Sequence, residues 1–380
     1  MHPMPQQAQA QLTSAIYIHI PFCNSICPYC AFYKLPWSRE NEVQFLDAIL
    51  KELDFYKTTH PNIQVTSLFI GGGTPSALSV DILDPLLNAL HTTFDFPSGI
   101  EKTCEMNPES IKDENLEILK KHGINRISMG VQSFNQTELT YLGRTHSIQT
   151  VFDAVEKIKH HQFKNWNLDL IFSTAPSTVE SLTATLKTAI ALNPPHISAY
   201  SLSIESGTAF EKRNIPWPED DPDKAQYDHL IQTMTDAGYH QYEVSNFAKP
   251  GYECTHNLTY WTLDNYIGIG PSAVSYYNGY HYQNPRDLAQ YINSPEPSMP
   301  AEPESTLSQL NDALTSILRL REGMDINRFN ARFNIDFTKE RASELSAMRN
   351  NQLIEQTPTH IKTTLKGQLV LDSILERLIY

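Results

Sequence analysis

IHIPFCNSICPYC, residues 18–30, places three cysteines within eight positions. Cys23, Cys27 and Cys30 follow the spacing CxxxCxxC. A loop after the short apolar strand AIYIHI (15–20) would bring their three sulfurs into one small volume. Iron–sulfur clusters are held by cysteine thiolates, and a four-iron cubane ordinarily takes four of them. Three thiolates would therefore leave one iron open to another ligand.

Two other kinds of cysteine site share part of this pattern. A structural zinc site usually has four protein ligands from two paired clusters, and a thioredoxin-like redox site needs only CxxC near a helix start. A second CxxC is absent from the sequence, because Cys104 and Cys254 stand alone. The spacing favours the iron–sulfur cluster, and a zinc-binding structural protein without radical chemistry is the alternative.

Short apolar segments alternate with amphipathic ones from this loop to about residue 205. Residues 41–56, for example, have their apolar positions on one side of a helix. Strands joined by helices form parallel sheets, so the alternation predicts an α/β fold whose parallel sheet is curved or closed as in a barrel. The predicted strands are residues 15–20, 65–70, 102–106, 126–131, 167–172 and 196–203.

The rest of the chain divides at a stretch rich in proline and glutamate. SPEPSMPAEPES (294–305) is typical of an extended linker. The amphipathic segments that follow it predict a small helical or winged-helix module. The predicted divisions are a disordered tail over 1–13, a barrel with an irregular, aromatic-rich extension over 14–290, a linker over 291–305 and the carboxy-terminal module over 306–380.

Composition and charge exclude some classes of protein. The 380 residues are 40% hydrophobic and 19% charged, as in ordinary globular proteins. The net charge of −14 argues against nucleic-acid binding, which needs a basic face. The sequence contains neither an apolar run long enough for a bilayer nor a secretory pattern, so we expect a cytoplasmic protein. Five cysteines, an odd number, fit a metal site in a reducing compartment better than disulfides.

The cluster loop resembles that of radical-SAM enzymes, and the wider sequence is similar to the coproporphyrinogen-oxidase-like branch of that superfamily. The carboxy-terminal module resembles that branch too. Family-like blocks occur in the same order over about residues 15–275: GGGTPS (71–76), EMNPES (105–110), NRISMGVQSF (125–134), YLGRTHS (141–147), NLDLIF (167–172), SAYSLSIESGT (198–208), YEVSNFA (242–248) and HNLTYW (256–261).

This resemblance implies a partial (β/α)6 TIM-like barrel with a small carboxy-terminal helical or winged-helix domain. It also implies a [4Fe-4S] cluster whose open iron binds the amino and carboxylate groups of S-adenosylmethionine. In the superfamily, reduction then cleaves S-adenosylmethionine to a 5′-deoxyadenosyl radical.

The residues at the family's motif positions are expected to contact S-adenosylmethionine. The glycine turn should bind its methionine part, because glycine lets a backbone approach a ligand closely. Carboxylates can take an ammonium or ribose hydroxyls, and an arginine fork can take a carboxylate. The resemblance assigns to this site Tyr17, Tyr29, Gly72, Gly73, Thr74, Glu105, Gln132, Arg144, Asp169, Ser203 and Val274.

Two loops depart from the family pattern. STAPS (173–177) stands where the family commonly has a GLPGQ-like loop after the fifth strand. GIGPSA (268–273) replaces a GxGAHS-like block. Both loops are expected to border the pocket, so contacts to adenine or substrate at these places are open.

Three features favour a heme chaperone over an oxygen-independent coproporphyrinogen III oxidase within this branch. Phe32 stands where the oxidases typically carry a further cysteine. Only 22 residues precede Cys23, whereas the oxidases have a longer arm before the cluster. The third feature is HNLTYW (256–261), which matches an HNxxYW motif associated with heme binding in the chaperones.

The HNLTYW segment supplies the expected heme site. His256 could ligate the heme iron through its imidazole, and Cys254 is an alternative thiolate ligand. Tyr260 and Trp261, with Asn257 in the same motif, could flank a porphyrin face because flat apolar rings stack well.

The expected partners are heme and heme-accepting client proteins, which at the family level are respiratory. Peripheral membrane association would fit such clients, and a homodimer bridged through the cluster or heme is open. The sequence also leaves open whether S-adenosylmethionine is turned over. Coproporphyrinogen oxidation, or another radical-SAM reaction, is the enzymatic alternative.

Overall fold

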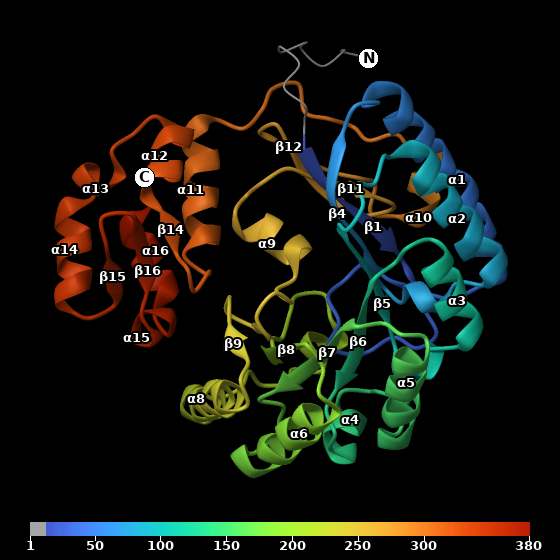
Figure 1. Ribbon diagram of the computed structural model, residues 1–380, viewed down its shortest axis with the longest axis horizontal. Helices are drawn as coiled ribbons and strands as arrows, with labels where there is room; N and C mark the ends of the chain where they lie inside the picture. Colours follow the sequence, from blue (N-terminus) through green and yellow to red (C-terminus); the bar gives the residue numbers. More distant parts are fainter. Residues whose placement is uncertain (1–12) are drawn as a thin grey trace.

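The protein is built around an 11-stranded curved sheet, seen in a computed structural model that describes residues 13–380 (Figure 1). Thr13 already belongs to the first strand, so the rest of the tail predicted over 1–13 lies outside the described residues. Six parallel strands lie side by side in sequence order. They are β1 (Thr13–Ile20), β4 (Gln64–Gly72), β5 (Glu101–Met106), β6 (Arg126–Gln132), β7 (Asn165–Phe172) and β8 (His196–Ser201).

Helices cover the outer side of the arc (Figure 1). Five of the six fit the spacing expected of an amphipathic connector, and their buried apolar residues join the leucine- and isoleucine-rich core behind the sheet. The connecting helices are α1 (Arg39–Thr59), α2 (Val80–Thr93), α3 (Asp113–Lys121), α4 (Gln136–Tyr141), α5 (Ile148–His160) and α6 (Val179–Leu192). The predicted parallel α/β sheet is therefore confirmed.

Residues 206–290 are more regular than the sequence indicates. They extend the sheet at both ends, so that β13 and β9 are its two edges and the barrel stays open. On the β1 side, β11 is parallel and the next two strands are antiparallel, whereas on the β8 side both added strands are antiparallel. These elements are α7 (Ala209–Lys212), α8 (Asp220–Asp236), β9 (His240–Gln241), β10 (Asn246–Ala248), β11 (Tyr266–Ile269), β12 (Val274–Tyr277) and β13 (Tyr280–Gln283).

One helix lies on the concave side of the sheet rather than outside it. This helix, α9 (Thr255–Trp261), carries the HNLTYW segment and contacts β4 (Figure 1). It fills part of the opening that the incomplete barrel leaves. The fold thus places the expected heme motif inside the arc.

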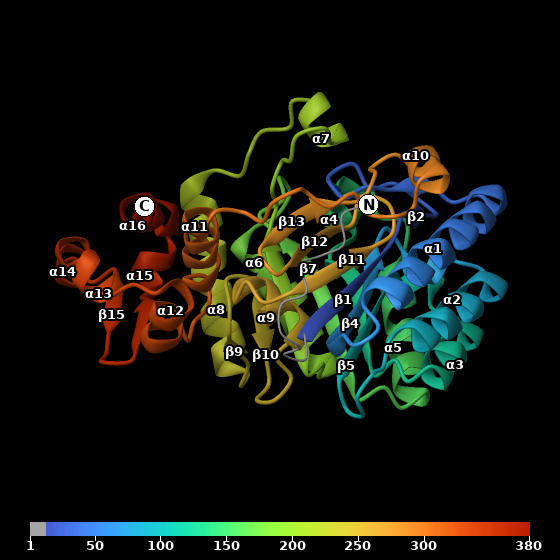
Figure 2. The ribbon, with the colours of Figure 1, turned by 90° about the horizontal axis from the view of Figure 1, so that it is seen from above.

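The carboxy-terminal module stands at one end of the molecule (Figure 2). Its core also includes Leu263 and Tyr276 of the barrel extension, so it packs directly beside α9. Helix α10 (Leu288–Asn293) runs into the start of the linker predicted over 291–305. The module consists of α11 (Thr306–Ile317), α12 (Ile326–Phe333), α13 (Phe337–Glu340), α14 (Ala342–Asn350), α15 (Leu365–Gln368) and α16 (Leu371–Leu378), with the sheet β14 (Met324–Asp325), β16 (His360–Thr363) and β15 (Ile354–Gln356). Over residues 13–380, the helices are all too short or too polar to cross a membrane.

Candidate functional site

The three cysteines lie in a loop at the carboxyl end of β1. Strand β2 (Phe22–Cys23) pairs with β3 (Leu35–Pro36) and closes the base of this loop. The amide of Trp37 donates to the Cys23 carbonyl at 2.9 Å, which ties the two ends together. A loop fixed in this way holds its cysteines at the rim where the parallel strands end.

The glycine turn after β4 holds the start of the cysteine loop from the other side. The Gly73 amide donates to the Ile20 carbonyl at 2.7 Å, and the Thr74 amide donates to the Phe22 carbonyl at 2.8 Å. A Cβ on Gly73 would lie 2.7 Å from the Phe22 carbonyl oxygen and 3.0 Å from the Cys23 sulfur. Only glycine therefore allows this close approach of the two backbones.

Polar side chains donate to two of the three cysteine sulfurs. The Thr74 hydroxyl donates to Cys23 Sγ at 3.6 Å, and the Arg144 guanidinium donates to Cys27 Sγ at 3.4 Å. Burial raises the pKa of the Cys23 and Cys30 thiols. Donors aimed at sulfur suit thiolates that carry metal, because second-shell hydrogen bonds orient and tune such ligands.

Three cysteines alone do not complete a structural zinc site, which usually takes four protein ligands. Among residues 13–380, no set of three histidine, cysteine, aspartate or glutamate side chains is arranged to hold a single metal ion. The hydrogen-bond donors aimed at the sulfurs and the glycine cradle fit a cluster held by three thiolates.

Carboxylates line the concave face of the sheet below the cysteine loop. Glu105 Oε2 accepts a hydrogen bond from the Gly72 amide at 3.1 Å. Burial, followed by the nearby Asp169 carboxylate, raises the pKa of Glu105 to about 8. Asp169 accepts from Ser128 Oγ at 3.2 Å and Asn167 Nδ2 at 2.8 Å, and burial raises its pKa too. A ligand that brings an ammonium or hydroxyl donors would find unused acceptor capacity here, and S-adenosylmethionine carries both kinds of donor.

Hydrogen bonds link some of the predicted S-adenosylmethionine residues. Asn107 bonds both Thr74 and Arg144. Burial, followed by the nearby Glu105, raises the pKa of Tyr17. Gln132 ends β6 with a φ of 70°, and Tyr29 packs on Phe210 from α7 with ring centroids 6.4 Å apart. The Ser203 hydroxyl donates to Glu205 at 2.5 Å, and Val274 begins β12.

The two loops that depart from the family pattern have distinct local structures. In STAPS, the Thr174 and Ser177 hydroxyls lie 2.6 Å apart, so the loop closes on itself. In GIGPSA, the Gly270 amide donates to the buried Glu52 carboxylate at 2.9 Å. Asn284 and Tyr291 also donate to Glu52 at 2.6 Å each, and burial raises its pKa to about 8. The second loop is therefore anchored to α1 behind the sheet.

His256 is buried against the inner face of β1 and β4. Its ring stacks on Phe69 at 5.1 Å and lies 6.5 Å from the Tyr17 ring. Both ring nitrogens are paired: Nδ1 lies 2.8 Å from Ser67 Oγ, and Nε2 lies 2.9 Å from Tyr260 Oη. Burial, with Arg126 as a second cause, lowers the pKa of His256 to about 3. The imidazole is thus neutral, as metal binding requires, but a nitrogen is free only after one hydrogen bond opens.

The other residues of the heme motif differ in burial. Asn257, Tyr260 and Trp261 are all partly exposed along α9. Cys254 is fully buried; its thiol donates to Glu101 at 3.3 Å, and burial raises its pKa to about 12. A thiol held in this state is a poor thiolate ligand, so His256 is the better candidate.

Sequence reasoning missed three residues of this region. Asn107 connects Thr74 and Arg144 by hydrogen bonds, although the sequence showed only a polar residue at the end of a strand. Ser67 and Glu101 hold His256 and the start of α9. A serine within a strand gives no signal of such a partner, because the partner is distant in the sequence.

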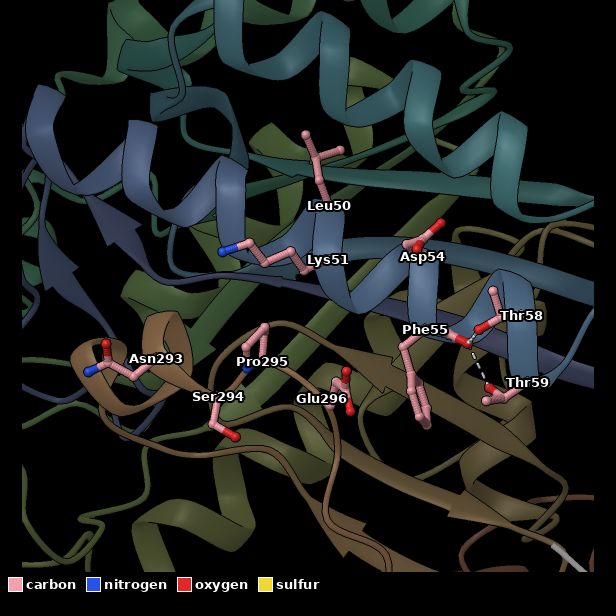
Figure 3. Close-up of a pocket in the computed structure, with 10 residues that line it drawn as sticks. All are labelled: Leu50, Lys51, Asp54, Phe55, Thr58, Thr59, Asn293, Ser294, Pro295 and Glu296. Atoms are coloured by element: carbon pink, nitrogen blue, oxygen red, sulfur yellow. Dashed lines mark hydrogen bonds between the residues drawn. The ribbon is translucent and has the colours of Figure 1, made fainter. Parts of the chain in front are cut away.

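A pocket of about 840 Å³ lies away from these residues, between the outer side of α1 and residues 293–296 (Figure 3). Its lining includes Lys51, Asp54, Phe55 and Glu296, and none of the predicted site residues. We therefore assign it no part in the candidate site.

Comparisons with known proteins point to one family. A model of the Radical SAM superfamily matches residues 17–189, and a model of the HemN C-terminal domain matches residues 307–370. Heme chaperone HemW of Lactococcus lactis is 32% identical, with 97% of each chain covered. Heme chaperone HemW of Bacillus subtilis is 33% identical over 93% of this chain and 96% of its own. Heme chaperone HemW of Escherichia coli is 38% identical over 68% of this chain and 69% of its own.

A solved structure has the same fold. Coproporphyrinogen III oxidase (HemN) from Escherichia coli, described as a radical SAM enzyme, superposes with a TM-score of 0.84. It is 24% identical, and the match covers 97% of this chain and 90% of that one. The expected incomplete barrel with a carboxy-terminal module is therefore a HemN-like radical SAM fold.

Proposed function

Because the chain belongs to the heme chaperone HemW family within the radical SAM superfamily, we propose that it is itself a heme chaperone. It would bind heme beside a [4Fe-4S] cluster with S-adenosylmethionine and deliver the heme to client proteins. The observation that carries this proposal is the position of α9, whose His256 ring lies 6.5 Å from the ring of Tyr17. The heme motif thus adjoins a residue expected to contact S-adenosylmethionine.

Cys23, Cys27 and Cys30 would hold the cluster, which supplies an electron to S-adenosylmethionine when bound. The Thr74 and Arg144 donors support this assignment, since each already faces a cysteine sulfur. Three thiolates are fewer than the four protein ligands that a structural zinc site usually takes, which argues against the alternative of a structural zinc protein.

Glu105 and Asp169 would hold the polar groups of S-adenosylmethionine below the cluster. Burial raises the pKa of both carboxyl groups, and the nearby Asp169 carboxylate raises that of Glu105 further. An ammonium bound between them would favour their charged forms and remove this cost of burial. Arg144 would orient the ligand's carboxylate, as a guanidinium fork commonly does.

Heme would bind along α9 with His256 as the axial ligand. This requires α9 to move enough to release either Ser67 or Tyr260 from the ring. The Tyr260 side is the better candidate, because Tyr260 is partly exposed whereas Ser67 is buried within β4. Tyr260 and Trp261 would then lie against the porphyrin.

Heme titration of purified protein tests this assignment. We expect His256→Ala to weaken heme binding at least about tenfold, about 1.4 kcal/mol, with a changed Soret band. Tyr260→Phe should bind heme more tightly than wild type, because the ring nitrogen loses its competing partner. His91→Ala on α2 is a matched control, since its ring bonds only the His122 carbonyl. Unchanged affinity in His256→Ala would remove His256 from the site.

Coproporphyrinogen III oxidation is the second candidate, because the fold matches HemN over 97% of this chain. Phe32 counts against it: the side chain is 66% exposed beside the cluster loop, where the oxidases typically carry a cysteine. Anaerobic protein with reductant, S-adenosylmethionine and coproporphyrinogen III would form protoporphyrinogen IX if this candidate is right. A loaded cluster without product would exclude it.

The cellular location of the protein is also inferred from the chemistry of its cysteines. All five cysteines are unpaired, and cluster thiolates need a reducing compartment, so we place the protein in the cytoplasm. Three further points stay predictions: that the client proteins are respiratory, that the protein associates peripherally with a membrane, and that it forms a homodimer.

A further inference from the structure

Three polar side chains, those of Thr74, Asn107 and Arg144, form a continuous chain between two of the cysteine sulfurs. Asn107 Nδ2 donates to Thr74 Oγ1 at 3.0 Å, and that hydroxyl donates to Cys23 Sγ at 3.6 Å. On its other side, Asn107 Oδ1 accepts from Arg144 Nη2 at 2.7 Å, while Arg144 Nη1 donates to Cys27 Sγ at 3.4 Å. Asn107 is the central member of this chain and touches neither sulfur.

We propose that Asn107 is a positioning residue that sets the reduction potential of the cluster by aiming Thr74 and Arg144 at the thiolates of Cys23 and Cys27. This inference rests on the proposed function only in assuming that the three cysteines bind a cluster. It adds a role for a residue that would itself contact neither the cluster nor S-adenosylmethionine.

An asparagine suits this place because its amide donates and accepts at once. Arginine can only donate, so the atom of Asn107 that faces Arg144 is its oxygen, and its nitrogen must face Thr74. The Thr74 hydroxyl, once it accepts from this nitrogen, has its own proton free for the Cys23 sulfur. A carboxylate at the same place would accept from both neighbours and draw that proton away from sulfur.

The surrounding backbone holds Asn107 in this orientation. Its backbone amide donates to the Ser110 hydroxyl oxygen at 3.3 Å at the start of a short turn, Pro108–Ser110. Gly130 lies against it: a Cβ there would come within 3.1 Å of Asn107 Oδ1. Arg144 is also fixed, because it donates to the Gly130 carbonyl at 2.9 Å.

Hydrogen bonds to thiolates withdraw negative charge from an iron–sulfur cluster and stabilise its reduced form, so they raise its reduction potential. Without Asn107, the Thr74 hydroxyl and the Arg144 fork lose the partner that aims them. The cluster should then become harder to reduce, although its three cysteines are intact.

The test is a redox titration of anaerobically reconstituted full-length protein, followed by electron paramagnetic resonance. Asn107→Asp keeps the shape and the acceptor for Arg144 but removes the donor to Thr74, and Asn107→Leu removes both. We expect both variants to have a more negative midpoint potential than wild type. The matched control is Asn115→Leu, whose buried amide bonds only the Ser76 carbonyl, and its potential should equal that of wild type.

A thermodynamic cycle shows whether Asn107 acts through Thr74. The shift in Thr74→Val/Asn107→Leu should be smaller than the sum of the two single shifts, because both changes remove the same donor from Cys23. Full iron loading with an unshifted potential in Asn107→Asp would overturn the proposal, as would additive shifts. If wild-type protein binds no iron, the proposed function fails instead, so the two failures are distinct.

Discussion

Glu105 is a carboxylic acid that the fold keeps protonated near neutral pH. Burial and Asp169 raise its pKa to about 8, against about 4.3 in an unfolded chain. Between these two values the folded protein holds a proton that the unfolded chain has lost. The free energy of unfolding contributed by this group therefore falls as pH rises, by up to about 1.4 kcal/mol per pH unit.

Replacing Glu105 by glutamine removes this dependence. In protein without cluster, the stability of Glu105→Gln relative to wild type should increase from about pH 5 to about pH 8, by at least about 2 kcal/mol in total. Urea unfolding of both proteins at several pH values measures the difference, and other titrating groups cancel. Parallel stability curves would show that Glu105 is already ionised in the fold.

At the scale of single residues, the sequence predicts those site residues that belong to a recognisable motif. The cysteines and the glycine turn are close in the chain to the strands that position them, so spacing was informative. Asn107 and Ser67 act through partners brought near only by folding; Ser67 and His256 are 189 positions apart. For that reason the sequence indicated His256 but not that both of its nitrogens are occupied.

Helix α9 depends on a single buried carboxylate at its start. Glu101 accepts from the amides of Thr255 at 3.2 Å and His256 at 3.1 Å, and it lies 4.0 Å from the buried Arg126 guanidinium. The carboxylate thus accepts hydrogen bonds from otherwise unpaired amides of the first helical turn and compensates the charge of a buried cation.

We expect Glu101→Ala to lower the free energy of unfolding by about 3 kcal/mol, because it leaves a buried charge uncompensated. Glu253→Ala is the matched control: Glu253 pairs with the largely exposed His240 and should cost less than about 1 kcal/mol. The double variant Arg126→Met/Glu101→Ala should lose less free energy of unfolding than the sum of the losses in the two single variants. Equal losses for Glu101 and Glu253 in chemical denaturation would contradict this account.

The six-residue helix α4 was not predicted from the sequence. The strands and the other helices of the six-stranded arc were predictable because each has a clear apolar period. The strands β9 to β13 were not, since they have two to four residues each, too few for any period to show. Their places are set by pairing with the edges of the arc, which is a tertiary effect. The burial of α9 on the concave side likewise depends on those edges.

At the scale of the whole molecule, the carboxy-terminal module donates hydrogen bonds to the carboxyl end of α9. Arg332 of α12 donates to the carbonyls of Thr262 at 3.0 Å and Leu263 at 2.7 Å, where α9 ends. Arg328 pairs with Asp264 at 2.9 Å, but both side chains are largely exposed. A module distant in the sequence thereby stabilises the helix that carries the heme motif.

Arg332→Met should loosen the end of α9. Loss of these hydrogen bonds costs about 1 kcal/mol, so the amides of Thr262, Leu263 and Asp264 should exchange with solvent deuterium about fivefold faster. Mass spectrometry of the peptide covering 255–264 measures this rate. Arg328→Met is the control and should change it little. Equal rates in wild type and Arg332→Met would mean that the module does not support α9.

The central claim is that one chain holds a [4Fe-4S] cluster and binds heme without oxidising porphyrinogen. The most direct measurement is anaerobic reconstitution, followed on the same sample by iron and sulfide analysis, heme titration and the coproporphyrinogen III assay. We predict four irons and four sulfides per chain, a saturable Soret band that depends on His256, and no protoporphyrinogen IX. Bound zinc with almost no iron, or steady formation of protoporphyrinogen IX by the loaded protein, would contradict the account.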